Sequence, residues 1–519
     1  MEPTTALINL LRSFMIFTAH HPRHRRFSSR LRVDASQTLR CWFVAIAAIT
    51  CLVIASITPP FQAADEYLHF YRAYQISTGQ LIPDRQTGSC SGYSYDFSNE
   101  LCLGGALPRS LLMTVRQASA EDLRFDATRK QDWASWRRLW SLPLNPDDRH
   151  FLKFNTTGLH APIGYVPQAI GIAIRRSLAR LPGFPPPPPI ALMYCGRLAN
   201  GLLWTGFVYF AMQLAPEFTL GWLAIGLLPM ALFQASSLSA DVLTNGLACL
   251  LVALVVRYRS RPWEASIVPW LLSLLTALFA VSKLAYAPMA LLLLLVPARS
   301  FFPLCTRPHC TLCRWLWLGA TGFLAIASVF AWSQVVDQIY VSLHPELDPT
   351  AQIAGILADP LGFIAIAIVT LTTNAGHYLR QFIGVFGWLD TPLPTLHVIG
   401  YTIALTLAVL CGQTRVNLSD RYVRPWRKRD RCIAALALAG SIGLLCVLAY
   451  LWNIVGVDRI GGLQGRYFIP LAPLLLVICS PSRSRLKLRS LTTGTIGLAL
   501  ISGISTITTL VQRYYAIGS

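Results

Sequence analysis

The chain has 519 residues, of which 54% are hydrophobic and only 13% are charged. A soluble protein covers its surface with charged side chains, which make up about a quarter of its residues. The composition therefore excludes an ordinary soluble enzyme and predicts a surface that largely faces lipid. The 44 Lys and Arg residues outnumber the 24 Asp and Glu residues, for a net charge of +20. Because the basic residues cluster between apolar runs, we expect them to mark cytoplasmic loops and expect no nucleic-acid partner.

The first part of the chain predicts a basic tail and one membrane-spanning helix. Residues 1–40 are rich in Arg and are expected to stay in the cytoplasm. Residues 41–58 are uncharged and about long enough to cross a bilayer. Pro59 and Pro60 follow in place of a signal-peptide cleavage site, so we expect this helix to be retained.

Residues 59–189 have the composition of a large outer loop with juxtamembrane helices. Within it, residues 161–180 combine an apolar pattern with Arg175, Arg176 and Arg180 at one end. This pattern suits a helix that lies in the membrane interface, although a crossing helix remains an alternative. Residues 181–189, LPGFPPPPP, predict a stiff polyproline spacer.

Residues 190–511 predict the transmembrane bundle, and residues 512–519 a short tail. With the first helix the chain has about 11–13 candidate spans, so we expect an all-α polytopic membrane protein. If residues 190–214 run inward, the basic clusters around Arg259, Arg307, Arg415–Arg431 and Arg483–Arg489 all fall on the cytoplasmic side. The candidate spans after the first are 190–214, 218–236, 242–256, 266–282, 284–297, 314–335, 359–374, 376–389, 396–412, 432–452, 466–480 and 491–511.

Asp65 and Glu66 stand out because acidic residues at a lipid boundary are costly unless they are solvated or paired. In a helix Asp65, His69 and Arg72 would share one face. A carboxylate near a dry cavity can act as a general base on a hydroxyl group. The alternative is that Asp65 merely caps a helix in the interface.

The expected topology brings further charged residues to the same face as Asp65. Carboxylates there could transfer protons or bind a divalent cation such as Mg²⁺ or Mn²⁺, and cations could bind a phosphate. Metal dependence stays open at this point, and Lys283 or Arg380 alone could instead reach toward the interface. The expected set of substrate-binding residues is His69, Arg72, His160, Asp241, Lys283, Arg380, Asp390 and Arg466.

Cysteines are mostly inside predicted helices, where they act as small apolar residues. Cys90 and Cys102 are the exceptions in the outer loop. An oxidising compartment would allow a disulfide between them.

Seven segments, in order from residue 59 to about 476, resemble the bacterial polytopic membrane family catalogued as domain of unknown function 2142. They are PPFQAADEYLHFYRAYQISTGQ, HAPIGYVPQAIGIAI, YCGRLANGLLW, SSLSADVLTNGLA, KLAYAPMALLLLLVP, GVFGWLDTPLP and GGLQGRYFIPLAPLLL. More distantly, the plan is similar to the GT-C class of glycosyltransferases, which take a sugar from a polyprenyl-phosphate carrier.

The GT-C resemblance implies an inverting transfer to a cell-envelope glycan or lipid on the outer face of the bacterial inner membrane. Asp65 would be the general base, with Glu66 assisting or binding. His160 would lie near the site, Asp241 would form a second acidic motif and Arg466 would hold the carrier phosphate. Lipid-oligosaccharide transferases of this class usually carry a large folded domain after the last span. None is expected here, which disfavours a peptide acceptor of that kind. A lipid-linked glycan transporter (flippase) and a non-catalytic assembly subunit are the alternatives.

Overall fold

The computed structural model describes residues 30–92, 96–118, 120–183, 185–263, 267–301, 309–342, 346–411, 425–480 and 488–515. Most of the predicted basic tail (1–29), the chain end (516–519) and loop residues such as Arg307, Arg415 and Arg483 lie outside these ranges. The chain divides into two compact units, Met1–Cys41 and Trp42–Ser519. The packing and the site described below belong to the second unit.

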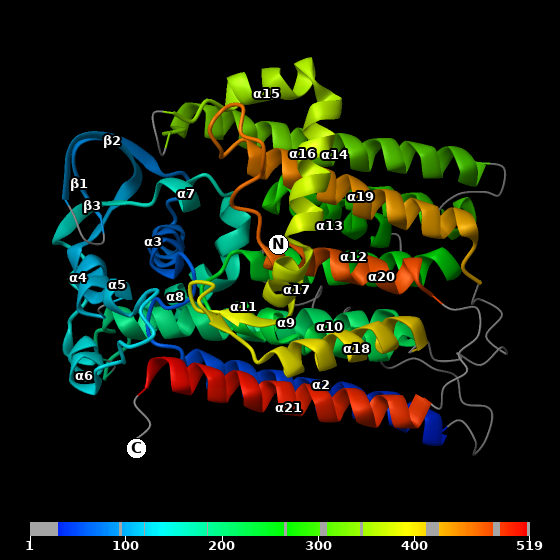
Figure 1. Cartoon of the computed structure of the whole chain (residues 1–519), viewed down its shortest axis with the longest axis horizontal. Helices are drawn as coiled ribbons and strands as arrows, with labels where there is room; N and C mark the ends of the chain where they lie inside the picture. Colours follow the sequence, from blue (N-terminus) through cyan, green and yellow to red (C-terminus); the bar gives the residue numbers. More distant parts are fainter. Residues whose placement is uncertain are drawn as a thin grey trace. The chain divides into compact units, whose positions relative to one another are not determined.

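The second unit is a helical bundle joined to a smaller region that contains a sheet (Figure 1). The first helix, α2 (Arg30–Ile57), starts well before the predicted residue 41. The later elements of the bundle are α9 (Pro189–Leu214), η2 (Pro216–Phe218), α10 (Thr219–Gly226), α11 (Pro229–Ala235), α12 (Asp241–Ser260), α13 (Val268–Ser282), η3 (Leu284–Leu295), η4 (Ala298–Phe301), α14 (Cys310–Ile339), α15 (Pro349–Ala358), α16 (Pro360–Thr373), α17 (Ala375–Gly384), β4 (Val385–Phe386), β5 (Thr391–Pro392), α18 (Thr395–Cys411), α19 (Lys428–Tyr450), η6 (Gly465–Leu471), α20 (Ala472–Ile478) and α21 (Leu488–Tyr514).

The bundle confirms the predicted all-α polytopic class, but fewer helices than expected are full spans. Within the described ranges, five helices are long and apolar enough to cross a membrane, or seven if each of two bent pairs is one span. Four shorter apolar helices, of 10–17 residues, account for further predicted spans. The predicted span 376–389 is interrupted, because α17 ends at Gly384 and the short β4–β5 hairpin follows. The predicted span 218–236 is divided into α10 and α11.

Prolines cause the two sharp bends. Pro216 follows α9, and the chain turns by 110° into the next helix. Pro360 follows α15, and the chain turns by 106°. A proline ring cannot donate a hydrogen bond and clashes with the preceding turn, but it fits the first turn of a new helix. Asp359 completes the second bend, because its side chain accepts a hydrogen bond of 2.8 Å from the amide of Gly362.

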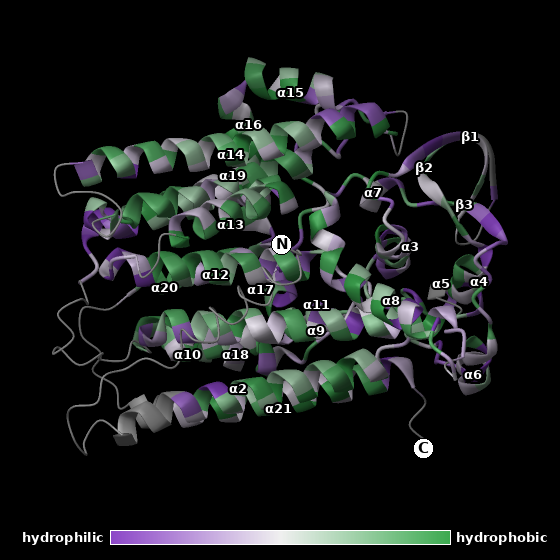
Figure 2. Cartoon of the chain, turned by 180° about the vertical axis from the view of Figure 1, so that it is seen from behind, coloured by the Kyte–Doolittle hydropathy of each residue, from purple (hydrophilic) through white to green (hydrophobic). Residues whose placement is uncertain are grey.

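Burial separates a central helix from a peripheral one. In its most apolar stretch α12 has 78% of its residues buried in the protein, whereas α14 has 17%. Leu316, Phe323 and Ile326 of α14 are instead exposed, as expected of a helix that faces lipid. Hydrophobic residues run along α14, and hydrophilic ones gather in the sheet (Figure 2).

The sheet-bearing region, residues 66–178, corresponds to most of the predicted outer loop. Its three strands were not predicted from the sequence. β1 and β2 pair antiparallel from Asp84↔Gly104 to Ser91↔Asp96, and β2 and β3 pair antiparallel from Gly104↔Lys153 to Pro108↔Arg149. The elements are α3 (Glu66–Ser77), β1 (Asp84–Ser91), β2 (Asp96–Pro108), α4 (Arg109–Gln117), α5 (Ala120–Leu123), α6 (Trp133–Ser141), β3 (Arg149–Lys153), α7 (Asn155–Gly158), η1 (Pro162–Tyr165) and α8 (Val166–Leu178).

Helix α8 covers the segment expected to lie in the interface. Its 13 residues extend about 20 Å, less than the roughly 30 Å of a bilayer core. One face packs on α9, where Gly171 permits close approach because a Cβ atom there would lie 2.4 Å from the Cys195 carbonyl oxygen. The opposite face exposes Ile170 and Ile174. This two-sided character suits the predicted interfacial helix, whose position in a membrane stays a prediction.

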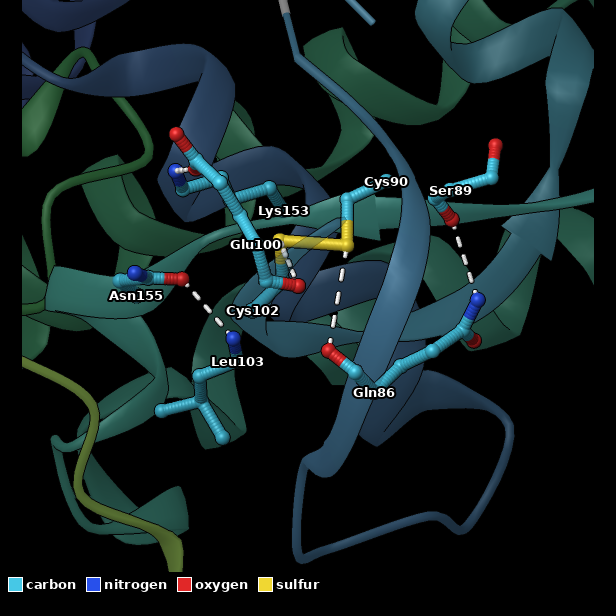
Figure 3. The surroundings of a disulfide bond; sticks show 8 residues. All are labelled: Gln86, Ser89, Cys90, Glu100, Cys102, Leu103, Lys153 and Asn155. Atoms are coloured by element: carbon cyan, nitrogen blue, oxygen red, sulfur yellow. Dashed lines mark hydrogen bonds and ion pairs between the residues drawn. A yellow bond between two sulfur atoms is a disulfide. The ribbon is translucent and has the colours of Figure 1, made fainter. Parts of the chain in front are cut away.

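Cys90 of β1 and Cys102 of β2 form a disulfide, the pair expected from the sequence (Figure 3). Both side chains are buried. Beside them, Lys153 donates to Glu100 over 2.9 Å, and the Leu103 amide donates to Asn155 over 2.9 Å. The disulfide therefore closes a sheet that is also held by polar contacts to β3 and α7.

We expect a Cys90→Ser/Cys102→Ser variant to loosen the sheet. Closing a loop with a sequence separation of 12 stabilises a fold by about 2–3 kcal/mol, mainly by restricting the unfolded chain. Limited proteolysis should cut residues 84–108 faster in the variant than in the wild type. Cys432→Ser, which removes an exposed free thiol, is the control. Equal cleavage rates in all three proteins would contradict the stabilising role.

Candidate functional site

Asp65 lies between α2 and α3 with a strained backbone. Its φ of 59° is in the left-handed region that residues other than glycine rarely adopt. Its side chain makes no capping hydrogen bond to α3, so the helix-cap alternative is wrong. The half-buried side chain forms no hydrogen bond or ion pair with any described residue. Strain of this kind concentrates at functional sites, and this carboxylate is left available.

Glu66, in contrast, is fully engaged by Arg197 of α9. Arg197 donates from Nε to Oε1 over 2.8 Å and from Nη2 to Oε2 over 2.6 Å. Both side chains are almost completely buried. The guanidinium also donates to the carbonyl oxygens of Ala55, Thr58 and Pro59 near the end of α2. A bidentate pair with this many hydrogen bonds joins α2, α3 and α9, so its geometry suits positioning, not the catalytic role expected for Glu66.

The same network holds the loop that leads into α12. The amide of Leu238 donates to Glu66 Oε1 over 3.1 Å. Asn200 Nδ2 donates to the carbonyl oxygens of Ser237 and Ser239, and Gln168 Nε2 donates to those of Leu238 and Ser239. These buried bonds fix the first residue of α12, Asp241.

Asp241 lies together with two cations, one of which also interacts with Asp65. Lys283 Nζ is 2.9 Å from Asp241 Oδ1 and 4.2 Å from the centre of the Tyr467 ring. Arg466 interacts electrostatically with both Asp241 and Asp65. Its buried Nε has no hydrogen-bond partner in the described part of the chain. Two carboxylates and two cations that are distant in sequence therefore meet at the ends of α3, α12, η3 and η6, which we call the site end of the bundle.

A buried tyrosine connects the two predicted histidines. Tyr165 Oη is 2.9 Å from His69 Nδ1 and 3.3 Å from His160 Nδ1. Burial lowers the pKa of His69 to about 3, with the charges of His160, Arg466 and Lys283 adding to the effect and Asp241 opposing it. Burial also raises the pKa of the Tyr165 hydroxyl. Near neutral pH both groups are uncharged. They can therefore orient a neutral hydroxyl group next to the charged residues of the site end.

The lowered pKa of His69 predicts loss of stability in acid. An unfolded histidine has a pKa near 6.5, so below that pH the unfolded chain binds a proton that the folded chain refuses until about pH 3. The free energy of unfolding should drop by about 2 kcal/mol between pH 6.5 and pH 5. Melting in detergent at pH 7.5 and pH 5 should show a smaller difference for His69→Gln than for the wild type. His150→Gln, at a partly exposed histidine near Asp148, should keep the wild-type difference. If His69→Gln keeps it too, His69 is not the cause.

Three residues of the predicted set do not join this group. Arg72 is buried near the two histidines but donates to Gln75 Oε1 over 2.6 Å and to the Leu81 carbonyl oxygen over 2.7 Å. Asp390 is 2.8 Å from Arg513 in a separate cluster on α21. Arg380 is exposed on α17, and no described contact links it to Asp65. The predicted convergence is therefore partial.

Sequence reasoning missed Arg197, Tyr165 and Tyr467. Arg197 carried a usable signal, because it is the one charged residue in the 26 residues of α9 and an ionisable residue in such a segment is typically functional or paired. Tyr165 and Tyr467 carried no such signal, since a tyrosine is neutral near pH 7 and is common at membrane interfaces.

A divalent cation was a possible cofactor. Among the residues that the structure describes, no three His, Cys, Asp or Glu side chains gather closely enough to hold a metal ion. Asp65 and Asp241 are the carboxylates at the site end, and Arg197 already binds Glu66.

These features define a polytopic helical membrane protein with a charged site beside a sheet-bearing region. The chain belongs to the family described as predicted membrane protein (DUF2142), whose model matches residues 49–475. Among the curated proteins compared with the chain, none matches it. The matched range includes every residue at the site end.

Proposed function

We propose that the chain is an inverting membrane glycosyltransferase that moves a sugar from a polyprenyl-phosphate carrier to a cell-envelope glycan or lipid. The observation that carries the proposal is the Asp65 carboxylate, which forms no hydrogen bond or ion pair with any described residue and interacts electrostatically with Arg466. A base and a phosphate-binding cation are the two groups that this reaction needs.

In the proposed reaction Asp65 takes the proton of the acceptor hydroxyl. The acceptor oxygen forms a bond to the anomeric carbon as the bond from that carbon to the carrier phosphate oxygen breaks. Attack from the opposite side inverts the anomeric carbon. Arg466, whose Nε lacks a hydrogen-bond partner among the described residues, binds the departing phosphate, and Lys283 adds positive charge. Asp65 then releases its proton to water.

The proposal places the site end on the outer face of the inner membrane and the N-terminus in the cytoplasm. The evidence for this orientation comes from the opposite end of the bundle, where Arg259, Arg299 and Arg314 lie near one another. Basic residues concentrate on the cytoplasmic side of membrane proteins. We call this the basic end.

Mass spectrometry of envelope glycans tests the proposal. Cells lacking the gene should lose one sugar residue from one glycan or lipid, and the wild-type gene should restore it. Unchanged glycans in the deletion strain would refute the proposal. If the purified protein binds labelled carrier but never transfers the sugar to any acceptor fraction, a transport role gains support over the enzyme.

A further inference from the structure

The basic end of the bundle contains a cavity of about 260 Å³. Its polar wall consists of Arg259 from α12, Arg314 from α14, and Arg427, Arg429 and Asp430 at the start of α19. Four guanidinium groups face one carboxylate, so the wall carries three surplus positive charges. No residue of the proposed glycosyl-transfer site lines this cavity.

Acidic partners compensate only part of this charge, because Asp430 pairs with Arg259, which also interacts electrostatically with Glu217. Arg259 uses Asp430 over 2.5 Å and the Pro425 carbonyl oxygen over 2.7 Å. Arg314 donates to the carbonyl oxygens of Val296 and Leu294, which fixes the guanidinium without neutralising it. Arg429 repels Arg314. Like charges that are held this close are stabilised by an anion between them.

Arg429 is the residue best placed to meet such an anion. It is exposed, and its side chain forms no hydrogen bond or ion pair with the described part of the protein. Its planar guanidinium matches the oxygens of a phosphate, which it can bind through two parallel hydrogen bonds.

The position of the cavity and its second wall indicate an amphiphilic ligand. Asp241 and Arg259 lie 18 residues apart on α12, which corresponds to about 27 Å along a helix. This is close to the thickness of a bilayer core, about 30 Å, so the cavity lies at the level of one row of lipid headgroups when the site end lies at the other. Leu294, Leu295 and Pro297 form an apolar side suited to the start of an acyl chain.

We propose that this cavity binds a phosphate group, supplied by an anionic phospholipid headgroup at the membrane surface opposite the site end. Arg429 and Arg427 contact the phosphate, Arg314 provides a fixed charge behind it, and the Leu294 side contacts the lipid chain. Free inorganic phosphate offers the same oxygens without the chain. The proposal does not depend on glycosyl transfer at the site end.

Native mass spectrometry of the detergent-purified full chain tests this binding with phosphatidylglycerol, phosphatidylcholine and inorganic phosphate as probes. Phosphatidylglycerol should bind more tightly than phosphatidylcholine. An Arg427→Gln/Arg429→Gln variant should bind phosphatidylglycerol at least about tenfold more weakly, because two cationic contacts are lost. The matched control is Lys428→Gln, which removes an exposed charge between the two arginines that does not line the cavity.

The results separate a built site from general surface charge. Retained affinity in Lys428→Gln, with loss in the double variant, supports the cavity. Equal losses in both variants would overturn it. A wild type that neither prefers phosphatidylglycerol to phosphatidylcholine nor binds phosphate would also overturn it. Millimolar phosphate that binds the wild type but not the double variant, without any lipid preference, supports the phosphate site and identifies the free anion as its source. The single variant Arg429→Gln can also be compared with Lys428→Gln for phosphatidylglycerol binding, and it changes the structure least.

Discussion

An Asp65→Asn variant is expected to lose sugar transfer by about 10²- to 10⁴-fold, the usual contribution of a general base. Asparagine has nearly the shape of aspartate but cannot accept the proton. It also tolerates the left-handed backbone found at this position, so the variant should fold and insert normally. Sugar incorporation into envelope glycans, measured in a deletion strain that expresses each variant at equal level, gives the result.

The control for Asp65→Asn is Asp147→Asn, which makes the same change at an exposed aspartate of the sheet-bearing region. It should retain wild-type transfer. Full transfer by Asp65→Asn would eliminate the general-base role. A failing Asp65→Asn variant that also melts at a lower temperature than Asp147→Asn would show structural damage instead.

The Arg197→Met variant is expected to be the least stable single substitution in this region. It removes the positive charge and leaves Glu66 buried without its partner, which costs about 3–5 kcal/mol in comparable buried pairs. The carbonyl oxygens of Ala55, Thr58 and Pro59 lose their donors as well. Thermal unfolding in detergent can be followed with a thiol-reactive dye, because Cys51 and Cys249 are buried in the folded chain.

Two comparison variants make the Arg197 result specific. Lys153→Met breaks the more exposed pair with Glu100 and should cost less than about 1 kcal/mol. The double variant Arg197→Met/Glu66→Leu removes both buried charges and should recover part of the loss. If Arg197→Met melts no lower than Lys153→Met, the buried pair of Arg197 and Glu66 does not hold α2, α3 and α9 together.

The sequence predicted the location of the site better than the roles of its individual residues. Asp65 follows the first apolar run directly, and Asp241 and Lys283 stand at the ends of apolar segments, so counting spans brought them to one face. The structure adds that the Asp65 side chain forms no hydrogen bond or ion pair with any described residue, whereas both carboxylate oxygens of Glu66 bind Arg197. Two adjacent acidic letters cannot reveal this difference, because the partner of Glu66 is 131 residues away.

Other features of the fold also differ in whether the sequence can predict them. Pro216 and Pro360 mark bends that are readable from the sequence, since proline ends one helix and begins the next. The strands around Cys90 and Cys102 were not predicted, because their Gly- and Ser-rich segments lack the alternating apolar pattern of a strand. Arg380 and Asp390 were grouped with Asp65 by topology alone, which fixes the side of a membrane but not the position across it.

The hydrogen bonds of Arg197 to α2 and α3 also determine when the site can form during synthesis. The ribosome makes Glu66 131 residues before Arg197, a delay of about 7–26 s at 5–20 residues per second. During this time the end of α2 and the start of α3 lack the group that connects them. The sheet-bearing region has by then been completed, but its attachment to the bundle awaits the insertion of α9. Truncated chains that end before Arg197 should therefore present Asp65 on an unfixed turn, whereas chains that include α9 should hold it in place.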